Sequence, residues 1–213
     1  MKVSGSFTPA SRAASAASAN YLVRPRRKKN RDTRSREYLT LAEVKKLRDA
    51  ARGEGRNGDR DGLLILMLFR HGLRVAEAVA LTWDDIQFDD GTIFVRRVKN
   101  GRESRHFMEG DEIRQLKQLR RESAASRFVF CSERGGPLSN RSVHHIVQKA
   151  GEAAGLPFSV HPHMLRHAKG FQLAQKGTDT RAIQGYLGHR DIKSTVIYTQ
   201  LDPGRFKGFG KDI

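Results

Sequence analysis

One short run of the chain joins the start of a helix to several basic side chains: His161-Pro162-His163-Met164-Leu165-Arg166-His167. Proline is well suited to the first position of a helix, so Pro162 predicts that a helix begins there, and Gly177 predicts its end. His163 and Arg166 are three residues apart, and such residues project from the same face of a helix. We therefore expect this helix to present an imidazole and a guanidinium together.

The same run could in principle bind a metal ion, because His163 and His167 are separated by one helical turn. The zinc protease motif requires a glutamate directly after its first histidine, and Met164 stands there instead. Cys131 is the only cysteine, so no cysteine cluster completes a site, and its apolar surroundings place it in the core. We expect no metal.

Two other runs hold further candidate groups. Gly188 is suited to end a helix and to expose His189, and Tyr198 follows nine residues later. Arg74 opens an amphipathic stretch, with Glu77 three residues on and able to pair with it on a helix. Taken singly, each has an ordinary alternative: a polar cap for the histidine, a core aromatic for the tyrosine, and a helical ion pair for the arginine.

The remaining pattern predicts a mainly α-helical fold with a small antiparallel β hairpin. Thr40 and Glu43 form a capping box before helical spacing. Asn100-Gly101 is a strong hairpin turn signal, and Lys99 lies beside it at the tip, where a solvated lysine is the ordinary alternative. The expected elements are a buried helix over 63–69, strands over 92–98, 103–108 and 127–131, and helices over 111–122, 139–153, 162–176, 179–187 and 191–198.

The charge of the chain indicates an anionic partner. Among 213 residues there are 40 Lys and Arg against 23 Asp and Glu, a formal net charge of +17. Nucleic acid is the commonest partner of such a surplus, and an anionic membrane surface is the alternative. No apolar run is long enough to cross a bilayer. The single cysteine suits a reducing cytoplasm, whereas the acid-poor N-terminus leaves an organellar transit peptide as an alternative.

The N-terminal segment differs from the rest in composition. Residues 1–23 are rich in Ser and Ala, and residues 24–36 carry a dense basic block. We expect residues 1–36 to be a disordered basic arm and residues 37–213 to form one catalytic domain. The block either follows a DNA backbone or serves as a solvated linker. Its candidate DNA contacts are Arg24, Arg26, Arg27, Lys28, Lys29 and Arg31.

Together, the candidate groups suit metal-free phosphoryl transfer. Guanidinium groups bind phosphate oxygens through paired hydrogen bonds and stabilise developing negative charge. A leaving alkoxide needs a general acid, and tyrosine can form a covalent phosphate ester. The ordered set that supplies these functions is Arg74, Lys99, His163, Arg166, His189 and Tyr198.

This ordered set resembles the tyrosine recombinase (phage integrase) family from about Glu37 to Tyr198. The whole layout is similar to the small fimbrial phase-variation recombinases, which share the runs around His161–His167, Tyr186–Arg190 and Gly204–Phe206. The resemblance implies the tyrosine recombinase catalytic fold and a 3′-phosphotyrosyl intermediate formed by Tyr198. Under it, we expect Lys99 to protonate the leaving 5′ oxygen and His163 to assist proton transfer at Tyr198. Arg74, Arg166 and His189 then bind the phosphate, and Glu77 supports the site.

The resemblance also implies partners and setting. We expect double-stranded DNA with paired recombination sites, a homotetramer on that DNA, accessory DNA-bending proteins, no membrane and no cofactor. The expected location is the bacterial cytoplasm, in association with the nucleoid. The product is inversion of a DNA segment, as in phase variation, or integration or excision of an element.

The chain departs from the family pattern at three places. Family members usually carry a helical DNA-clamping domain before the catalytic one, whereas only the basic arm precedes it here. Ala168-Lys169-Gly170 replaces the more usual Thr, aromatic and Ala, which we expect to change packing behind the site. The glycines and proline after residue 198 disfavour the C-terminal helix that many members place in a neighbouring subunit.

Three other classes of protein remain as alternatives. A type IB topoisomerase shares the tyrosine chemistry but acts as a monomer without paired sites. A DNA-binding regulator could keep the fold without catalysis, although neither Tyr198 nor either arginine has been lost. A ribosomal or membrane-surface protein would account for the charge but not for the ordered set of residues.

Overall fold

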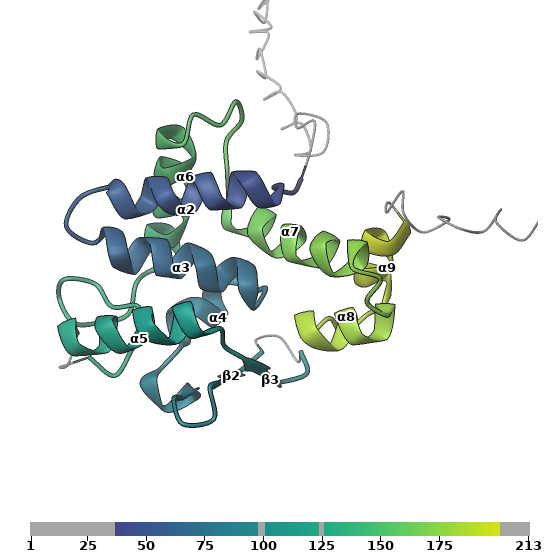
Figure 1. Ribbon diagram of the computed structural model, residues 1–213, viewed down its shortest axis with the longest axis horizontal. Coiled ribbons are helices and arrows are strands. Elements are labelled where there is room, and N and C mark those ends of the chain that lie inside the picture. Colours follow the sequence, from purple (N-terminus) through teal and green to yellow (C-terminus); the bar gives the residue numbers. More distant parts are fainter. Residues whose placement is uncertain (1–36, 98–100, 124–125, 201–213) are drawn as a thin grey trace, which may run out of the picture. The chain divides into compact units, whose positions relative to one another are not determined.

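The computed structural model describes residues 37–97, 101–123 and 126–200. These residues are mainly helical, and the apolar helix α3 lies between α2 and α5 (Figure 1). The mainly helical fold with a small antiparallel sheet is therefore confirmed. The helices are α2 (Leu41–Gly53), α3 (Gly58–Arg70), α4 (Val75–Ala80), α5 (Gly110–Glu122), α6 (Asn140–Ala153), α7 (Pro162–Gln175), α8 (Thr180–Leu187) and α9 (Lys193–Gln200), with a 3-10 turn, η1, at Trp83–Asp85.

Helix α2 begins at the predicted capping box. The backbone N–H of Thr40 donates to Glu43 Oε2 at 2.8 Å, and the N–H of Glu43 donates to Thr40 Oγ1 at 3.3 Å. This reciprocal pair satisfies two amide groups that the start of a helix would otherwise leave without partners. The buried face of α2, formed by Val44, Leu47 and Ala51, packs against α3 and α6.

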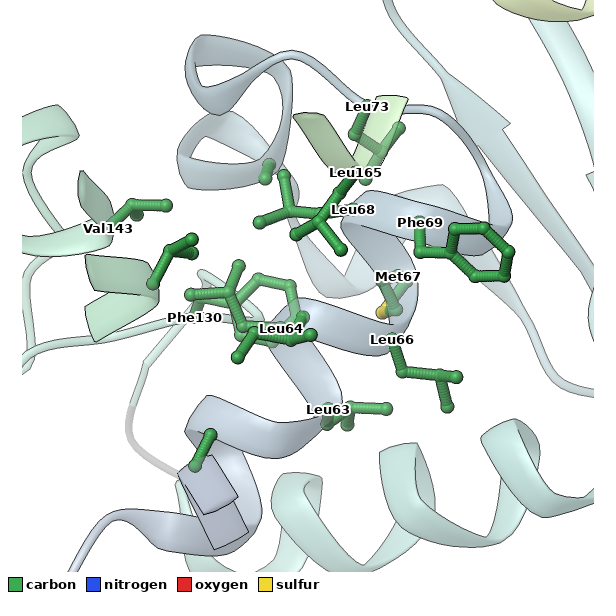
Figure 2. Close-up of a cluster of buried hydrophobic side chains, with 14 of the residues drawn as sticks. Leu63, Leu64, Leu66, Met67, Leu68, Phe69, Leu73, Phe130, Val143 and Leu165 are labelled. Atoms are coloured by element: carbon green, nitrogen blue, oxygen red, sulfur yellow. The ribbon is translucent and has the colours of Figure 1, made fainter. Parts of the chain in front are cut away.

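Helix α3 is the centre of the hydrophobic core. Every residue from Leu63 to Phe69 is buried, as predicted for a helix that is apolar on all sides. Figure 2 shows most of these side chains, with Phe130, Val143 and Leu165 in the same cluster; these three come from the segment after α5, from α6 and from α7. Truncating one such side chain to alanine costs about 2–5 kcal/mol, so α3 is a firm support for the residues that follow it.

The sheet has three antiparallel strands in the order β1-β2-β3: β1 (Ile86–Gln87), β2 (Thr92–Val95) and β3 (Ser104–Phe107). Thr92 pairs with Phe107 and Val95 with Ser104, which is the predicted hairpin with shorter strands. The short strand β1 was not predicted from the sequence. The turn that carries Lys99 lies outside the described residues.

The strand predicted over 127–131 is wrong. Phe128 forms an isolated bridge with Thr82, and Cys131 forms another with Pro137, so the segment contacts two different partners and joins no ladder. The apolar pattern that suggested a strand arises because Val129 and Phe130 are buried in the core. Cys131 itself is only partly buried, and its predicted place in the core is wrong too.

The C-terminal helices carry most of the candidate residues. Pro162 opens α7 as predicted, and Gly177, with a φ of 74°, follows its end. Helix α7 packs against α3, α8 and α9, which brings distant parts of the chain together. A second small apolar cluster lies here and consists of Ala174, Ile183, Leu187 and Tyr198. In the described part of the chain, no helix is long and apolar enough to span a membrane.

Candidate active site

Arg74 is held at the junction of α3 and α4. Gly72, with a φ of 57°, turns the chain there, and a Cβ at this position would lie 2.5 Å from the Leu187 side chain, so both the conformation and the packing require glycine. Arg74 is the N-cap of α4, and its Nη1 donates to Glu77 Oε1 at 2.7 Å. About a third of the Arg74 side chain is exposed, which leaves it able to contact a ligand.

Glu77 is a buried carboxylate that two arginines share. Its Oε2 accepts from the N–H of Arg74 at 2.9 Å and from Nη1 of Arg97 at 2.8 Å. Burial acts to raise the pKa of Glu77, but these donors outweigh it, and the pKa lies below its usual value. Glu77 therefore remains ionised. Arg97 was not singled out from the sequence.

Arg166 is a buried cation at the centre of the site. Arg166 is 1% exposed. Its Nη1 donates to the Gly72 carbonyl, and its Nη2 donates to the Leu187 carbonyl at 2.6 Å. Burial, and then the charges of Arg74 and Arg97, lower its pKa to about 9, so it is still protonated at neutral pH. Within the described residues Arg166 forms no ion pair. A buried guanidinium without a counterion favours the binding of an anion.

Tyr198 is buried against α7, and its hydroxyl contacts a histidine. Tyr198 Oη lies 3.0 Å from Nδ1 of His167, and the tyrosine is 1% exposed. Burial raises the pKa of Tyr198 to about 12 and lowers that of His167 to about 4. Both groups are therefore uncharged at neutral pH, and the tautomer of His167 decides which of the two donates the hydrogen bond. Gly170 lies directly beneath the ring, where a Cβ would be 2.6 Å from Tyr198 Cε2 and Cζ.

His163 reaches Tyr198 only through its neighbour on α7. Its ring stands edge-on to that of His167, with 4.4 Å between the ring centroids. Burial, and then the charges of Arg166 and Arg74, lower the pKa of His163. Sequence reasoning quoted His167 but gave it no part in the site, because its contact with Tyr198 depends on how α7 and α9 pack.

His189 lies at the turn between α8 and α9. Gly188 adopts the left-handed conformation that ends α8, with a φ of 64°, as predicted. Nδ1 of His189 lies 2.9 Å from Thr195 Oγ1, and its ring stacks on Tyr198 at 6.2 Å between centroids. Burial, and then the charges of Arg166 and Arg74, lower the pKa of His189 to about 3.

Five of the candidate residues thus come together from α4, α7, the α8–α9 turn and α9. These five are Arg74, His163, Arg166, His189 and Tyr198. The positive charges of Arg74 and Arg166 lower the pKa values of the other three, in addition to the effect of burial. Lys99 and the basic residues of the N-terminal arm lie outside the described residues. No group of His, Cys, Asp or Glu suited to a metal ion occurs in the described ranges.

A series of side-chain hydrogen bonds runs from β3 to α5, next to this site. Ser104 Oγ lies 2.8 Å from His106 Nε2, His106 Nδ1 lies 3.2 Å from His71 Nδ1, and His71 Nε2 lies 2.6 Å from Glu112 Oε1. Burial, and then the charge of His71, lower the pKa of His106 to about 3. These hydrogen bonds connect β3 to His71, the residue that follows α3 and precedes Gly72.

The geometry defines a class of site. Two guanidinium groups, neutral imidazoles and a phenol lie near one another, and the carboxylate of Glu77 pairs with Arg74 and Arg97. Groups of these types are suited to bind a phosphodiester and to offer it an oxygen nucleophile.

Comparison with known proteins gives the family. The model of the phage integrase family matches residues 37–205. The type 1 fimbriae regulatory protein FimE of Escherichia coli K12 is 42% identical over 179 residues, which cover 81% of this chain and 90% of FimE. FimB of the same strain is 40% identical over 186 residues, which cover 85% of this chain and 92% of FimB.

Solved structures agree with this result. XerA recombinase superposes with a TM-score of 0.70 at 26% identity, over 81% of this chain and 63% of XerA. XerH site-specific recombinase bound to its difH substrate gives a TM-score of 0.70 at 25% identity, over 80% of this chain and 52% of XerH. The chain thus spans less than two thirds of these solved recombinases. It belongs to the phage integrase family and is a site-specific tyrosine recombinase.

Acid should destabilise this domain because its partly buried imidazoles resist protonation. The folded-state pKa is about 3 for His106 and His189 and about 4 for His167, against 6.5 when exposed. Below pH 6.5 the unfolded chain binds protons that the folded chain does not, so stability is lost as the pH falls toward 4. We expect urea unfolding to show a loss of about 2 kcal/mol or more between pH ~7 and pH ~4.5. An unchanged unfolding free energy over this range would contradict the assignment of neutral histidines.

Proposed function

We propose that this recombinase cleaves and rejoins double-stranded DNA through a 3′-phosphotyrosyl intermediate at Tyr198. The observation that carries the proposal is the contact of the Tyr198 hydroxyl with His167, on the helix turn that also holds Arg166. Tyr198 Oη attacks the scissile phosphorus, and the bond to the 5′ oxygen breaks. The phenolic proton passes to the imidazole of His167, with His163 beside it, and Lys99 protonates the leaving 5′ oxygen.

The two arginines stabilise the charge that develops in this step. Arg166 and Arg74 bind the non-bridging oxygens, and His189 donates a hydrogen bond to the same phosphate. Burial first, and then the charges of Arg166 and Arg74, lower the pKa values of His163 and His189, and a bound phosphate offsets the second of these causes. The imidazoles therefore become better proton acceptors when DNA is present. The 5′-hydroxyl of a partner strand then attacks the phosphotyrosine, which restores the phosphodiester and frees Tyr198.

The reaction joins paired sites and inverts the DNA between them. Similarity to two type 1 fimbriae regulatory proteins over most of their length supports a regulatory inversion in preference to integration or excision. The XerH structure, bound to its difH substrate, supports DNA as the partner. We further propose a homotetramer on DNA, with accessory DNA-bending proteins, acting at the nucleoid in the bacterial cytoplasm. Residues 37–213 form the catalytic domain and residues 1–36 an arm that follows the DNA.

A plasmid assay tests this function. Inverted repeats in the DNA that flanks the gene would be cloned as pairs, in inverted or direct orientation, and incubated with purified protein. We expect inversion of the intervening segment between inverted sites, without ATP or metal. Relaxation of supercoils with no exchange between sites would identify a topoisomerase instead, and binding without any strand cleavage would identify a regulator.

The basic arm gives a separate prediction. Replacing Arg24, Arg26, Arg27, Lys28, Lys29 and Arg31 by glutamine should weaken DNA binding, because each phosphate contact releases counterions. The slope of log affinity against log salt should flatten by about 0.9 for each lost contact. Affinities measured by fluorescence anisotropy over a range of salt concentrations give this slope. An unchanged slope would mean that the arm is only a linker.

A further inference from the structure

We infer that Arg97 is a positioning residue for strand cleavage, acting through Glu77 on Arg74 and through the Tyr186 carbonyl on the turn that carries His189. This inference rests on the proposed role of Arg74 and His189 at the phosphate. Arg97 directly follows another arginine, Arg96. The Arg96 side chain is exposed, whereas the Arg97 side chain is 0% exposed.

The side chain of Arg97 connects three parts of the site. Arg97 lies two residues after Val95, the last residue of β2, and its Nη1 donates to Glu77 Oε2 at 2.8 Å. Nη2 donates to the carbonyl of Tyr186, two residues before Gly188. One guanidinium therefore joins the hairpin to the support of Arg74 and to the end of α8.

Two glycines make room for this path. A Cβ at Gly101 would lie 2.7 Å from Arg97 Cβ, and a Cβ at Gly188 would lie 2.7 Å from Arg97 Nε. Real Cβ atoms essentially never approach other heavy atoms so closely, so any larger residue would displace the arginine. Nε is itself buried without a hydrogen-bond partner in the described residues. The chain thus buries an imperfectly satisfied cation at this place.

The position of Arg97 determines how much positive charge reaches the phosphate. Three guanidinium groups, of Arg74, Arg97 and Arg166, lie around the one carboxylate of Glu77. With Arg97 present, Glu77 is neutralised from the side of the hairpin, and Arg74 retains positive charge for a ligand. Without Arg97, the buried carboxylate would be left to Arg74 alone and would draw it away from the phosphate. Because it is fully buried, Arg97 acts through Arg74 and not by touching DNA.

Arg96 provides a matched control. It precedes Arg97 in the same segment and also forms an ion pair, with Asp85 Oδ1 at 2.8 Å, but its side chain is 66% exposed. Its partner Asp85 is 2% exposed, but Asp85 Oδ2 also accepts from the N–H and the hydroxyl of Thr82, so this carboxylate keeps hydrogen-bond donors without Arg96. Arg96→Met and Arg97→Met therefore remove the same group from neighbouring positions.

Single-turnover cleavage of two DNA substrates tests the inference. One carries the normal scissile phosphate, and the other carries a methyl group in place of one non-bridging oxygen, with each stereoisomer assayed separately. We expect Arg97→Met to slow cleavage of the phosphate roughly 10- to 100-fold, and to slow cleavage of the less negative methylphosphonate much less. Arg96→Met should cleave both at nearly the wild-type rate. Arg97→Lys, which retains the charge beside Glu77, should recover part of the loss and serves also if Arg97→Met does not fold.

Two results would overturn the inference. One is an equal loss on both substrates, which would mean that Arg97 only supports packing; the other is no loss on either. Arg74→Ala separates this failure from a failure of the proposed function. If the loss of cleavage rate caused by Arg74→Ala is smaller on the methylphosphonate, but the loss caused by Arg97→Met is not, only the role of Arg97 is wrong. If the loss caused by Arg74→Ala is not smaller on the methylphosphonate, the role of Arg74 at the phosphate is wrong, and the inference falls with it.

Discussion

Replacing Arg166 by methionine is expected to slow single-turnover strand cleavage by about 100- to 1000-fold. Arg166 is a buried cation, 1% exposed, and its only hydrogen-bond partners in the described structure are the carbonyls of Gly72 and Leu187. Within the described residues no carboxylate forms an ion pair with Arg166, so its donors do not have to leave one to bind an incoming phosphate. Methionine fills similar space but offers neither charge nor donors, so the transition state loses a fixed electrostatic partner.

The same variant should be less stable. Each buried carbonyl left without a donor costs roughly 1–3 kcal/mol, partly offset because a buried charge is removed. Arg166→Lys separates the two effects, since lysine keeps the charge but cannot donate to Gly72 and Leu187 with the same planar group. Rapid-quench cleavage and urea unfolding measure them. Cleavage by Arg166→Met within tenfold of wild type would contradict the placement of the phosphate beside Arg166.

Replacing Gly170 by alanine should displace the nucleophile itself. The new methyl group would lie 2.6 Å from two carbon atoms of the Tyr198 ring, so the ring must move and its hydroxyl must leave His167. A misplacement of about 1 Å at a reacting group can cost about 100-fold in rate, and we expect a loss of that order in cleavage. Binding of DNA, which does not need the tyrosine, should change little.

Gly185 is the matched control for this variant. It lies within α8, and a Cβ there would meet no heavy atom within 4 Å. Gly185→Ala should therefore leave cleavage unchanged and should stabilise the helix by roughly 0.5–1 kcal/mol. Cleavage by Gly170→Ala at the rate of Gly185→Ala would show that the buried position of Tyr198 is not the one from which it reacts.

Structural features that depend on one or two neighbouring residues could be predicted from the sequence. The capping box at Thr40, the proline that opens α7 and the glycine that ends α8 each follow from the chemistry of one or two residues, and all were predicted. The buried character of α3 was also predicted, because its apolar residues occur on every side. The order and spacing of the candidate residues carried the resemblance to the family.

The contacts that were not predicted depend on packing between distant elements. His167 meets Tyr198 only because α9 lies against α7, and the spacing of the two residues along the chain does not encode this. Arg97 was hidden beside Arg96 in an apparent basic pair. One signal could have found it: residues alternate between the two faces of a strand, and Ile93 and Val95, on the same face as Arg97, are apolar and buried. Gly170 was expected to affect packing behind the site, and it lies directly against the tyrosine ring.

The most direct test is to identify the residue that becomes linked to DNA. A recombination site nicked beside the scissile phosphate would release a short 5′-hydroxyl fragment on cleavage, so that the covalent complex accumulates. After digestion with protease and nuclease, mass spectrometry should find a nucleotide joined through its 3′ phosphate to the peptide that contains Tyr198. Tyr198→Phe should bind the same DNA and yield no adduct. An adduct on another residue, a 5′ linkage, or an adduct formed by Tyr198→Phe would contradict Tyr198 as the nucleophile.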